Sequence, residues 1–190
     1  MNNAASIKAR LRNLAAKEHK PYDYVQTHYM IERLLYRLSI SKYADDFVLK
    51  GGLLLHVLFA EKARATRDID FLARFTSNSP ENLKAIFTNV CAIKADDAVV
   101  FDPNTLTAEA ITEGADYHGV RMKLTGFLNA LAASFSSIWA SAMSSCLIQS
   151  AWSILLCSAW TRSICGRILE NPSSRKNSRP CCIWLKQTAG

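Results

Sequence analysis

The composition of this 190-residue chain changes near residue 128, and the change limits which part of it can fold as a domain. Residues 1–128 carry 17 Lys and Arg against 15 Asp and Glu, a balance typical of globular proteins. Residues 129–190 carry 6 basic residues and 1 acidic residue, yet they hold five of the 6 cysteines and all 4 tryptophans. We expect one domain over 1–128 and a poorly structured tail over 129–190.

The cysteines and the N-terminus indicate a cytoplasmic protein. The chain has no CxxC pair or Cys/His zinc spacing, and Cys181 and Cys182 are adjacent, which does not support a disulfide framework. Residues 1–20 are polar and basic, without the apolar run of a signal peptide. The uncharged stretch from Leu124 to Thr161 leaves a membrane-associated protein as an alternative, but its many serines argue against a true span. We expect no membrane partner.

Hydrophobic periodicity predicts a mixture of helices and strands over the first 127 residues. Apolar residues at helical spacing cover 4–18, 23–39, 53–59 and 80–90, and strand patterns cover 47–49, 68–72, 99–101 and 117–127. Asp23 is expected to cap the second helix, and Glu32, Arg33 and Arg37 are expected to form its solvated face. The mixture predicts an α/β or α+β fold with a mixed sheet of at least three strands, flanked by helices.

Two aspartates on one predicted strand are the first candidate site. Side chains alternate along a strand, so Asp68 and Asp70 point the same way while Ile69 and Phe71 face a core. Two neighbouring carboxylates repel each other unless a cation compensates them, and oxygen ligands suit divalent cations. The alternative is an exposed edge strand whose acids pair with Arg64 and Arg67.

A pair of glycines lies upstream of these acids. Gly51 and Gly52 precede a predicted helix, and backbone N–H groups at a helix start form an anion site suited to phosphates. Fifteen residues separate Gly52 from Asp68, where the acidic motif begins. Glycines followed at this spacing by Asp-x-Asp on a strand resemble the nucleotidyltransferase signature of the polymerase-beta superfamily.

Three segments taken together resemble one family within that superfamily. Residues 31–39, 47–52 and 64–71 are similar, in this order, to motifs of the AbiEii/AbiGii abortive-infection toxins, and the resemblance covers about residues 5–128. It implies Mg²⁺-dependent transfer of a nucleotide from an NTP to RNA, such as tRNA, or to a protein, and a cognate antitoxin as partner. It also implies site residues: Asp68 and Asp70 for Mg²⁺ and catalysis, Gly51 and Gly52 for the triphosphate, and Lys50, Arg64 and Arg67 as phosphate partners.

The tail departs from the family's pattern. The family continues with a third acid, in a run like Asp-Ile-Gly-Phe-Gly-Asp, where this chain has residues 137–146. In a shifted reading frame, each codon consists of the third base of one residue's codon and the first two bases of the next codon. Read in this way, the codons for residues 137–144 permit Asp-Leu-Gly-Phe-Gly-Asp-Val. The same step permits a second family-like motif, Glu-Lys-Phe, later in the tail. We therefore predict a frameshift near residues 128–132.

A frameshift removes the third acid of the family's pattern from this chain. Without the third acid nothing obvious activates the acceptor hydroxyl, so we expect an impaired nucleotidyltransferase. The alternative is a catalytically dead module that binds NTP or antitoxin. If the chain is nevertheless active, the nearest replacement acids are Asp96, Asp97 and Asp116. The four histidines have no shared ligand spacing and are interpreted as surface or packed residues: His19, His28, His56 and His118.

Overall fold

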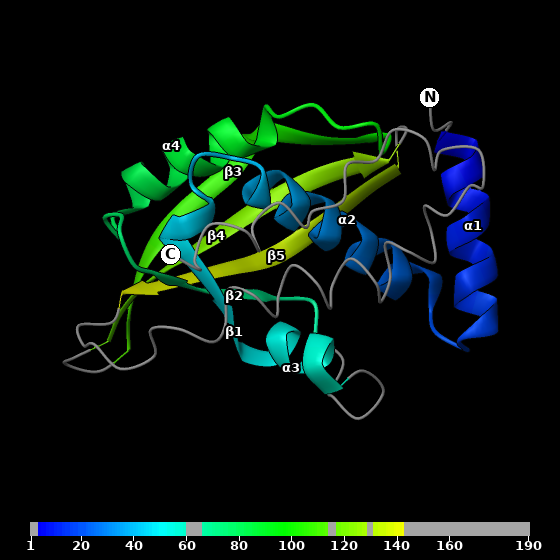
Figure 1. The fold of residues 1–190 in the computed structure, drawn as a ribbon, viewed down its shortest axis with the longest axis horizontal. Coiled ribbons are helices and arrows are strands. Elements are labelled where there is room, and N and C mark those ends of the chain that lie inside the picture. The colour runs from blue at the N-terminus through cyan, green and yellow to red at the C-terminus, as the bar shows by residue number, and fades with distance from the viewer. Residues whose placement is uncertain (1–3, 60–65, 114–116, 129–130, 143–190) are drawn as a thin grey trace, which may run out of the picture. The chain divides into compact units, whose positions relative to one another are not determined.

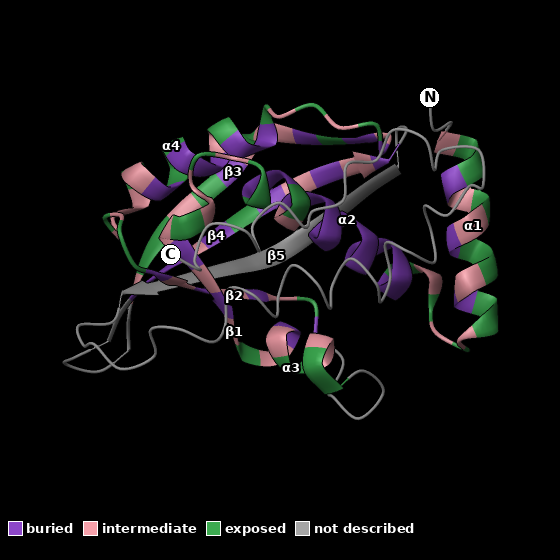
Figure 2. Cartoon of the chain, viewed as in Figure 1, coloured by how far each residue is buried: buried purple, intermediate pink, exposed green. Residues whose placement is uncertain are grey.

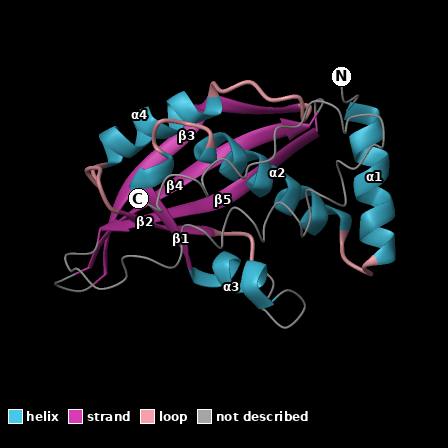
Figure 3. Ribbon diagram, in the orientation of Figure 1, coloured by secondary structure: helices cyan, strands magenta, loops and turns pink. Residues whose placement is uncertain are grey.

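A mixed β-sheet with helices packed against it forms the described part of the chain (Figures 1 and 3). The computed structural model describes residues 4–59, 66–113, 117–128 and 131–142. Over these residues the elements are α1 (Ala4–Lys17), α2 (Tyr22–Ser39), the 3-10 helix η1 (Ala44–Asp46), β1 (Phe47–Lys50), α3 (Gly51–Phe59), β2 (Ile69–Ala73), α4 (Pro80–Cys91), β3 (Val99–Glu113), β4 (Tyr117–Leu128) and β5 (Leu131–Ala142).

The strand order places the acidic strand inside the sheet. Among the described strands the order is β1-β2-β5-β4-β3, with β2 and β5 parallel and the other neighbours antiparallel. The predicted mixed fold is confirmed, and the sheet continues past residue 128 because β5 forms its third strand. The alternative of an exposed edge strand for the two aspartates is wrong, since β2 lies between β1 and β5.

Two helices cover one face of this sheet. Helix α2 contacts β5, α4 contacts β3, and the two helices contact each other. The predicted apolar stripe of α4 is buried, and Ser79 caps the helix by accepting a hydrogen bond from the Asn82 N–H at 3.2 Å. Phe47, Phe71 and Phe87 join β1, β2 and α4 in one aromatic cluster. No helix in the described ranges is both long and apolar enough for a membrane span.

Helix α2 differs from its prediction because it is a core helix. Every residue from Tyr24 to Leu34 is buried, and Figure 2 shows the helix as purple over most of its length. Glu32, Arg33 and Arg37, predicted as a solvated face, are only 3%, 5% and 2% exposed. Asp23 does not cap the helix either: Pro21 occupies the N-cap position, and no side chain bonds there.

Burial changes the charge state of one of these residues. Burial raises the pKa of Glu32 to about 8, and Arg33, whose guanidinium nitrogen lies 3.8 Å from the carboxyl oxygen, acts in the opposite direction. Glu32 is therefore mostly protonated at neutral pH, so α2 avoids the large cost of burying a carboxylate without hydrogen bonds.

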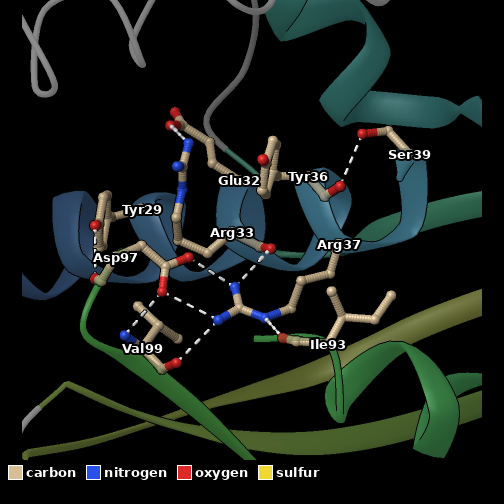
Figure 4. A network of polar contacts seen from close by, with 9 residues as sticks. All are labelled: Tyr29, Glu32, Arg33, Tyr36, Arg37, Ser39, Ile93, Asp97 and Val99. Carbon is tan, nitrogen blue, oxygen red and sulfur yellow. Dashed lines mark hydrogen bonds and ion pairs between the residues drawn. The ribbon is translucent and has the colours of Figure 1, made fainter. Parts of the chain in front are cut away.

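The buried Arg37 holds α2 to the segment that leads into β3 (Figure 4). Its guanidinium donates to both carboxylate oxygens of Asp97, at 2.7 and 3.0 Å, and to the carbonyls of Arg33, Ile93 and Val99. The Tyr29 hydroxyl donates to the Asp97 carbonyl at 2.9 Å. Because every one of these groups is buried or half-buried, the network satisfies charges and carbonyls that water does not reach.

Breaking this network is expected to destabilise the domain strongly. Asp97→Ala leaves the Arg37 guanidinium buried without its counter-charge, which costs about 3–5 kcal/mol. The measurement is the free energy of unfolding in urea, with Asp23→Ala as control, because Asp23 and Arg67 form an ion pair whose side chains are 64% and 53% exposed. Exposed pairs contribute about 1 kcal/mol or less. Equal losses in the two variants would contradict the structural role of Asp97.

Candidate active site

The glycine pair stands where β1 passes directly into α3. Strand β1 ends at Lys50 and the helix begins at Gly51, whose φ is +68°. A Cβ atom at Gly51 would lie 2.7 Å from Cγ of Asp70, which is closer than two carbon atoms that are not bonded to each other can approach. Both the backbone conformation and the space therefore require glycine here, and the carboxyl of Asp70 packs against the turn.

Asp70 connects this turn to the acidic strand. It lies opposite Lys50 in the β1–β2 register, and the Gly52 N–H donates a hydrogen bond to its carboxylate. Burial raises the pKa of Asp70, Lys50 and the Gly52 N–H lower it, and the nearby Asp68 raises it. The net shift is upward, so this carboxylate is less stable in its charged form than an exposed one.

The two aspartates alternate with core residues, as predicted. Ile69 and Phe71 are 0% and 2% exposed, whereas Asp68 and Asp70 are half-buried. Asp68 directly precedes β2, and its backbone N–H donates to Thr66 Oγ1 at 3.3 Å. The structure thus brings two carboxylates together beside a helix start, an arrangement that gives oxygen ligands for a divalent cation and N–H donors for phosphates.

The predicted basic residues are distributed differently. Lys50 lies beside Asp70, as its register and its effect on the Asp70 pKa indicate. Arg67 forms its ion pair with Asp23 of α2 at 2.6 Å. The alternative in which Arg67 neutralises the two site acids is therefore wrong. Arg64 lies outside the described residues.

Strand β5 supplies the other neighbour of the acidic strand. In the parallel register Ile138 is the partner of Ile69, and Trp139 is the partner of Asp70. Position 138 is where the shifted codons permit the third acid, so the backbone of β5 brings that position next to β2. The residues in the sequence there are Ser137 and Ile138.

Asp97, one of the three possible replacement acids, is bound elsewhere. Both oxygens of Asp97 are bonded to Arg37, and Asp97 precedes β3, the strand farthest from β1. Asp96 is next to it in the sequence, and Asp116 lies outside the described residues. Within the described ranges, no group of three or more His, Cys, Asp and Glu side chains is arranged to hold a metal ion. The described site offers two carboxylates.

His28 is a packed residue that contacts the segment directly before Asp68. His28 is buried, at 6% exposure, and its Nε2 lies 2.7 Å from the carbonyl oxygen of Thr66, two residues before Asp68. His56 is half-buried and its ring centroid lies 5.2 Å from that of His28. His19 is exposed, and the side chain of His118 lies outside the described residues. No spacing signal links His28 to Thr66, because 38 residues separate them.

A glycine turn packed on paired carboxylates within a mixed sheet is the arrangement of a nucleotidyltransferase fold. Comparison with known families agrees with the geometry: the family described as nucleotidyl transferase AbiEii toxin, Type IV TA system, matches residues 33–134. The match spans more than half of the chain and includes both glycines and both aspartates. The chain belongs to this family of toxin nucleotidyltransferases. No curated protein matches the sequence.

Proposed function

We propose that the site of Asp68, Asp70, Gly51 and Gly52 binds an NTP with Mg²⁺, in a fold built to transfer the nucleotide to an RNA, such as a tRNA, or to a protein. The observation that carries the proposal is the packing of the Asp70 carboxyl against the glycine turn. It brings the predicted metal ligands and the predicted triphosphate donors into one place. The partners are an NTP, an acceptor and a cognate antitoxin, in the cytoplasm.

The donor set fits a divalent cation. Asp68 and Asp70 are half-buried acids, and Asp68 is close enough to Asp70 to contribute to the raised pKa of its carboxyl. A bound Mg²⁺ would offset their repulsion and supply Lewis-acid stabilisation of the charge that develops on the triphosphate during transfer. The N–H groups at the start of α3 orient phosphate oxygens, and Lys50 adds a positive charge beside Asp70.

The chain as written is proposed to lack transfer activity because of a frameshift near residues 128–132. Two findings support this reading. The family match ends at residue 134, just after the shift, and the β5 register brings position 138 beside the acidic strand. A serine hydroxyl or an isoleucine at this place cannot act as a general base at neutral pH. The frameshift would leave residues 129–190 without selection for this fold, although residues 131–142 still form β5 of the sheet.

The same observation favours a second function for the 190-residue chain, that of a catalytically dead module. The glycine turn, Asp68 and Asp70 are intact, so NTP binding, antitoxin binding or both can persist without transfer. Mg²⁺-dependent labelling of RNA or protein by an NTP separates an enzyme from such a module.

Both proposed functions require NTP binding at this site, and binding of a fluorescent NTP analogue to the 190-residue chain tests it. We expect the affinity to depend on Mg²⁺ and to fall by ~10-fold in Asp70→Asn, about 1.4 kcal/mol of binding free energy, because the amide keeps the shape and removes the charge. Glu109→Gln is the matched control, since Glu109 is an exposed acid of β3, the strand farthest from β1. An affinity that depends on neither Mg²⁺ nor Asp70 would refute the proposed site.

A further inference from the structure

The two residues directly before Asp68 are held by α2. His28 contacts the carbonyl of Thr66 at 2.7 Å, and Asp23, on the same helix, pairs with Arg67 at 2.6 Å. The first contact is buried and the second is exposed. Buried hydrogen bonds hold their geometry better than exposed ion pairs, which water and salt weaken. The His28 contact is therefore the stronger constraint on this segment.

Thr66 contacts His28 on one side and, on the other, both Asp68 and the glycine turn. Its Oγ1 accepts a hydrogen bond from the Asp68 N–H at 3.3 Å. Its side chain also packs against Gly52, because a Cβ atom at that glycine would lie 3.3 Å from Cβ of Thr66. The N–H of Gly52 in turn donates to Asp70. A displacement of Thr66 would therefore change the positions of Asp68 and of the glycine turn together.

The chemistry of His28 suits a fixed donor. Burial lowers its pKa to about 4, the bond to Thr66 acts in the opposite direction, and the neighbouring His56, Lys20 and Arg67 lower it further. The ring is neutral at pH 7, and since a carbonyl oxygen only accepts, Nε2 carries the hydrogen. The ring also packs on Tyr24, at 4.3 Å between centroids, which limits its rotation.

We propose that His28 is a positioning residue: by donating to the Thr66 carbonyl it fixes Thr66 so that Asp68, Gly52 and Asp70 hold one geometry. The role of these acids as cation ligands rests on the proposed function. The contact between His28 and Thr66, and its effect on the position of Asp68, do not depend on that function. The position of Asp68 and the binding of a cation are therefore measured separately.

Three variants of the 190-residue chain separate positioning from general stability. His28→Gln keeps an N–H donor at the reach of Nε2, whereas His28→Asn carries the same amide one methylene shorter. Tyr29→Phe is the matched control, because it removes another buried bond from α2 to a backbone carbonyl, that of Asp97, away from the site. His28→Leu serves as the disrupting variant if a buried asparagine prevents folding.

Amide hydrogen exchange in the metal-free chain is the deciding measurement. We expect His28→Asn to speed exchange at the Asp68 N–H by ~10-fold more than Tyr29→Phe does, with His28→Gln restoring slow exchange. Equal exchange at Asp68 in the His28→Asn and Tyr29→Phe variants, or no rescue by glutamine, would overturn the proposal.

Mn²⁺ binding, followed by electron paramagnetic resonance, then tests the link to the acids. Loss of a group that orients metal ligands typically costs ~10–100-fold in affinity, and we expect a loss in this range for His28→Asn only. If exchange changes as expected but the unaltered chain binds no Mn²⁺ in an Asp70-dependent way, the positioning role stands and the proposed function fails. If Mn²⁺ binds through Asp70 and His28→Asn leaves its affinity unchanged, the positioning role is refuted.

Discussion

Correcting the reading frame by one base within the codons for residues 128–132 is expected to yield a chain that transfers nucleotide and arrests growth, whereas the 190-residue chain does neither. The reason is that β5 is the parallel neighbour of β2, the strand that carries Asp70. The shifted codons permit an aspartate on β5, and the family resemblance implies a third carboxylate there as the group that accepts the proton of an acceptor hydroxyl. A positioned base typically contributes ~10²–10⁴-fold to a rate.

The measurements are labelling of RNA and protein by a radioactive NTP with Mg²⁺, and growth after induction. A synonymous change in the same codons is the control. Toxicity of the unaltered chain that is lost on Asp70→Ala would contradict the frameshift account and would require an acid from elsewhere. Asp97 is unsuited to that role because Arg37 holds both of its oxygens. Resequencing is a separate check: a gene in which no single-base change restores the acidic motif would refute the frameshift.

The local part of the site could be predicted from the sequence because it depends on short-range rules. Alternation along a strand is enough to put Asp68 and Asp70 on one side and Ile69 in the core. The conformational freedom of glycine is enough to expect a turn at Gly51, which has a positive φ. The packing of Asp70 on that turn depends on the pairing of β1 with β2, which periodicity alone does not reveal. The resemblance to known nucleotidyltransferases implied only that the glycines and the acids serve one site.

The errors came from contacts between distant residues. Charged residues on an amphipathic helix usually face water, so Arg37 looked solvated, but Asp97, 60 residues away, satisfies it inside the core. Strand β3 was expected only over 99–101, yet it extends to Glu113 past Pro103, with a change of register between Asp102 and Thr107. The irregular register allows a strand to continue beyond a proline, and no local pattern reveals it.

In the frame-restored chain, Asp68→Ala and Asp70→Ala are each expected to abolish nucleotide transfer and to change thermal stability little. Transfer is lost because one carboxylate cannot hold the cation and the triphosphate together. Stability changes little because Asp70 already has a raised pKa, partly through Asp68, so removing either charge relieves a repulsion. That relief offsets the loss of the Gly52 N–H bond, which is worth about 0.5–1.5 kcal/mol.

Comparing the loss of transfer activity with the change in thermal stability shows whether Asp68 and Asp70 are catalytic or structural residues. Labelling rate and melting temperature are measured on the same preparations, with Glu109→Ala as the control that should change neither, because Glu109 is an exposed acid of β3, the strand farthest from β1. A variant of Asp70 that melts far below the parent yet retains transfer would assign this residue to the fold. Loss of transfer at an unchanged melting temperature, in both aspartate variants, requires that the acids act on the substrate and its cation, since the packing of Ile69 and Phe71 on the other side of β2 is then intact.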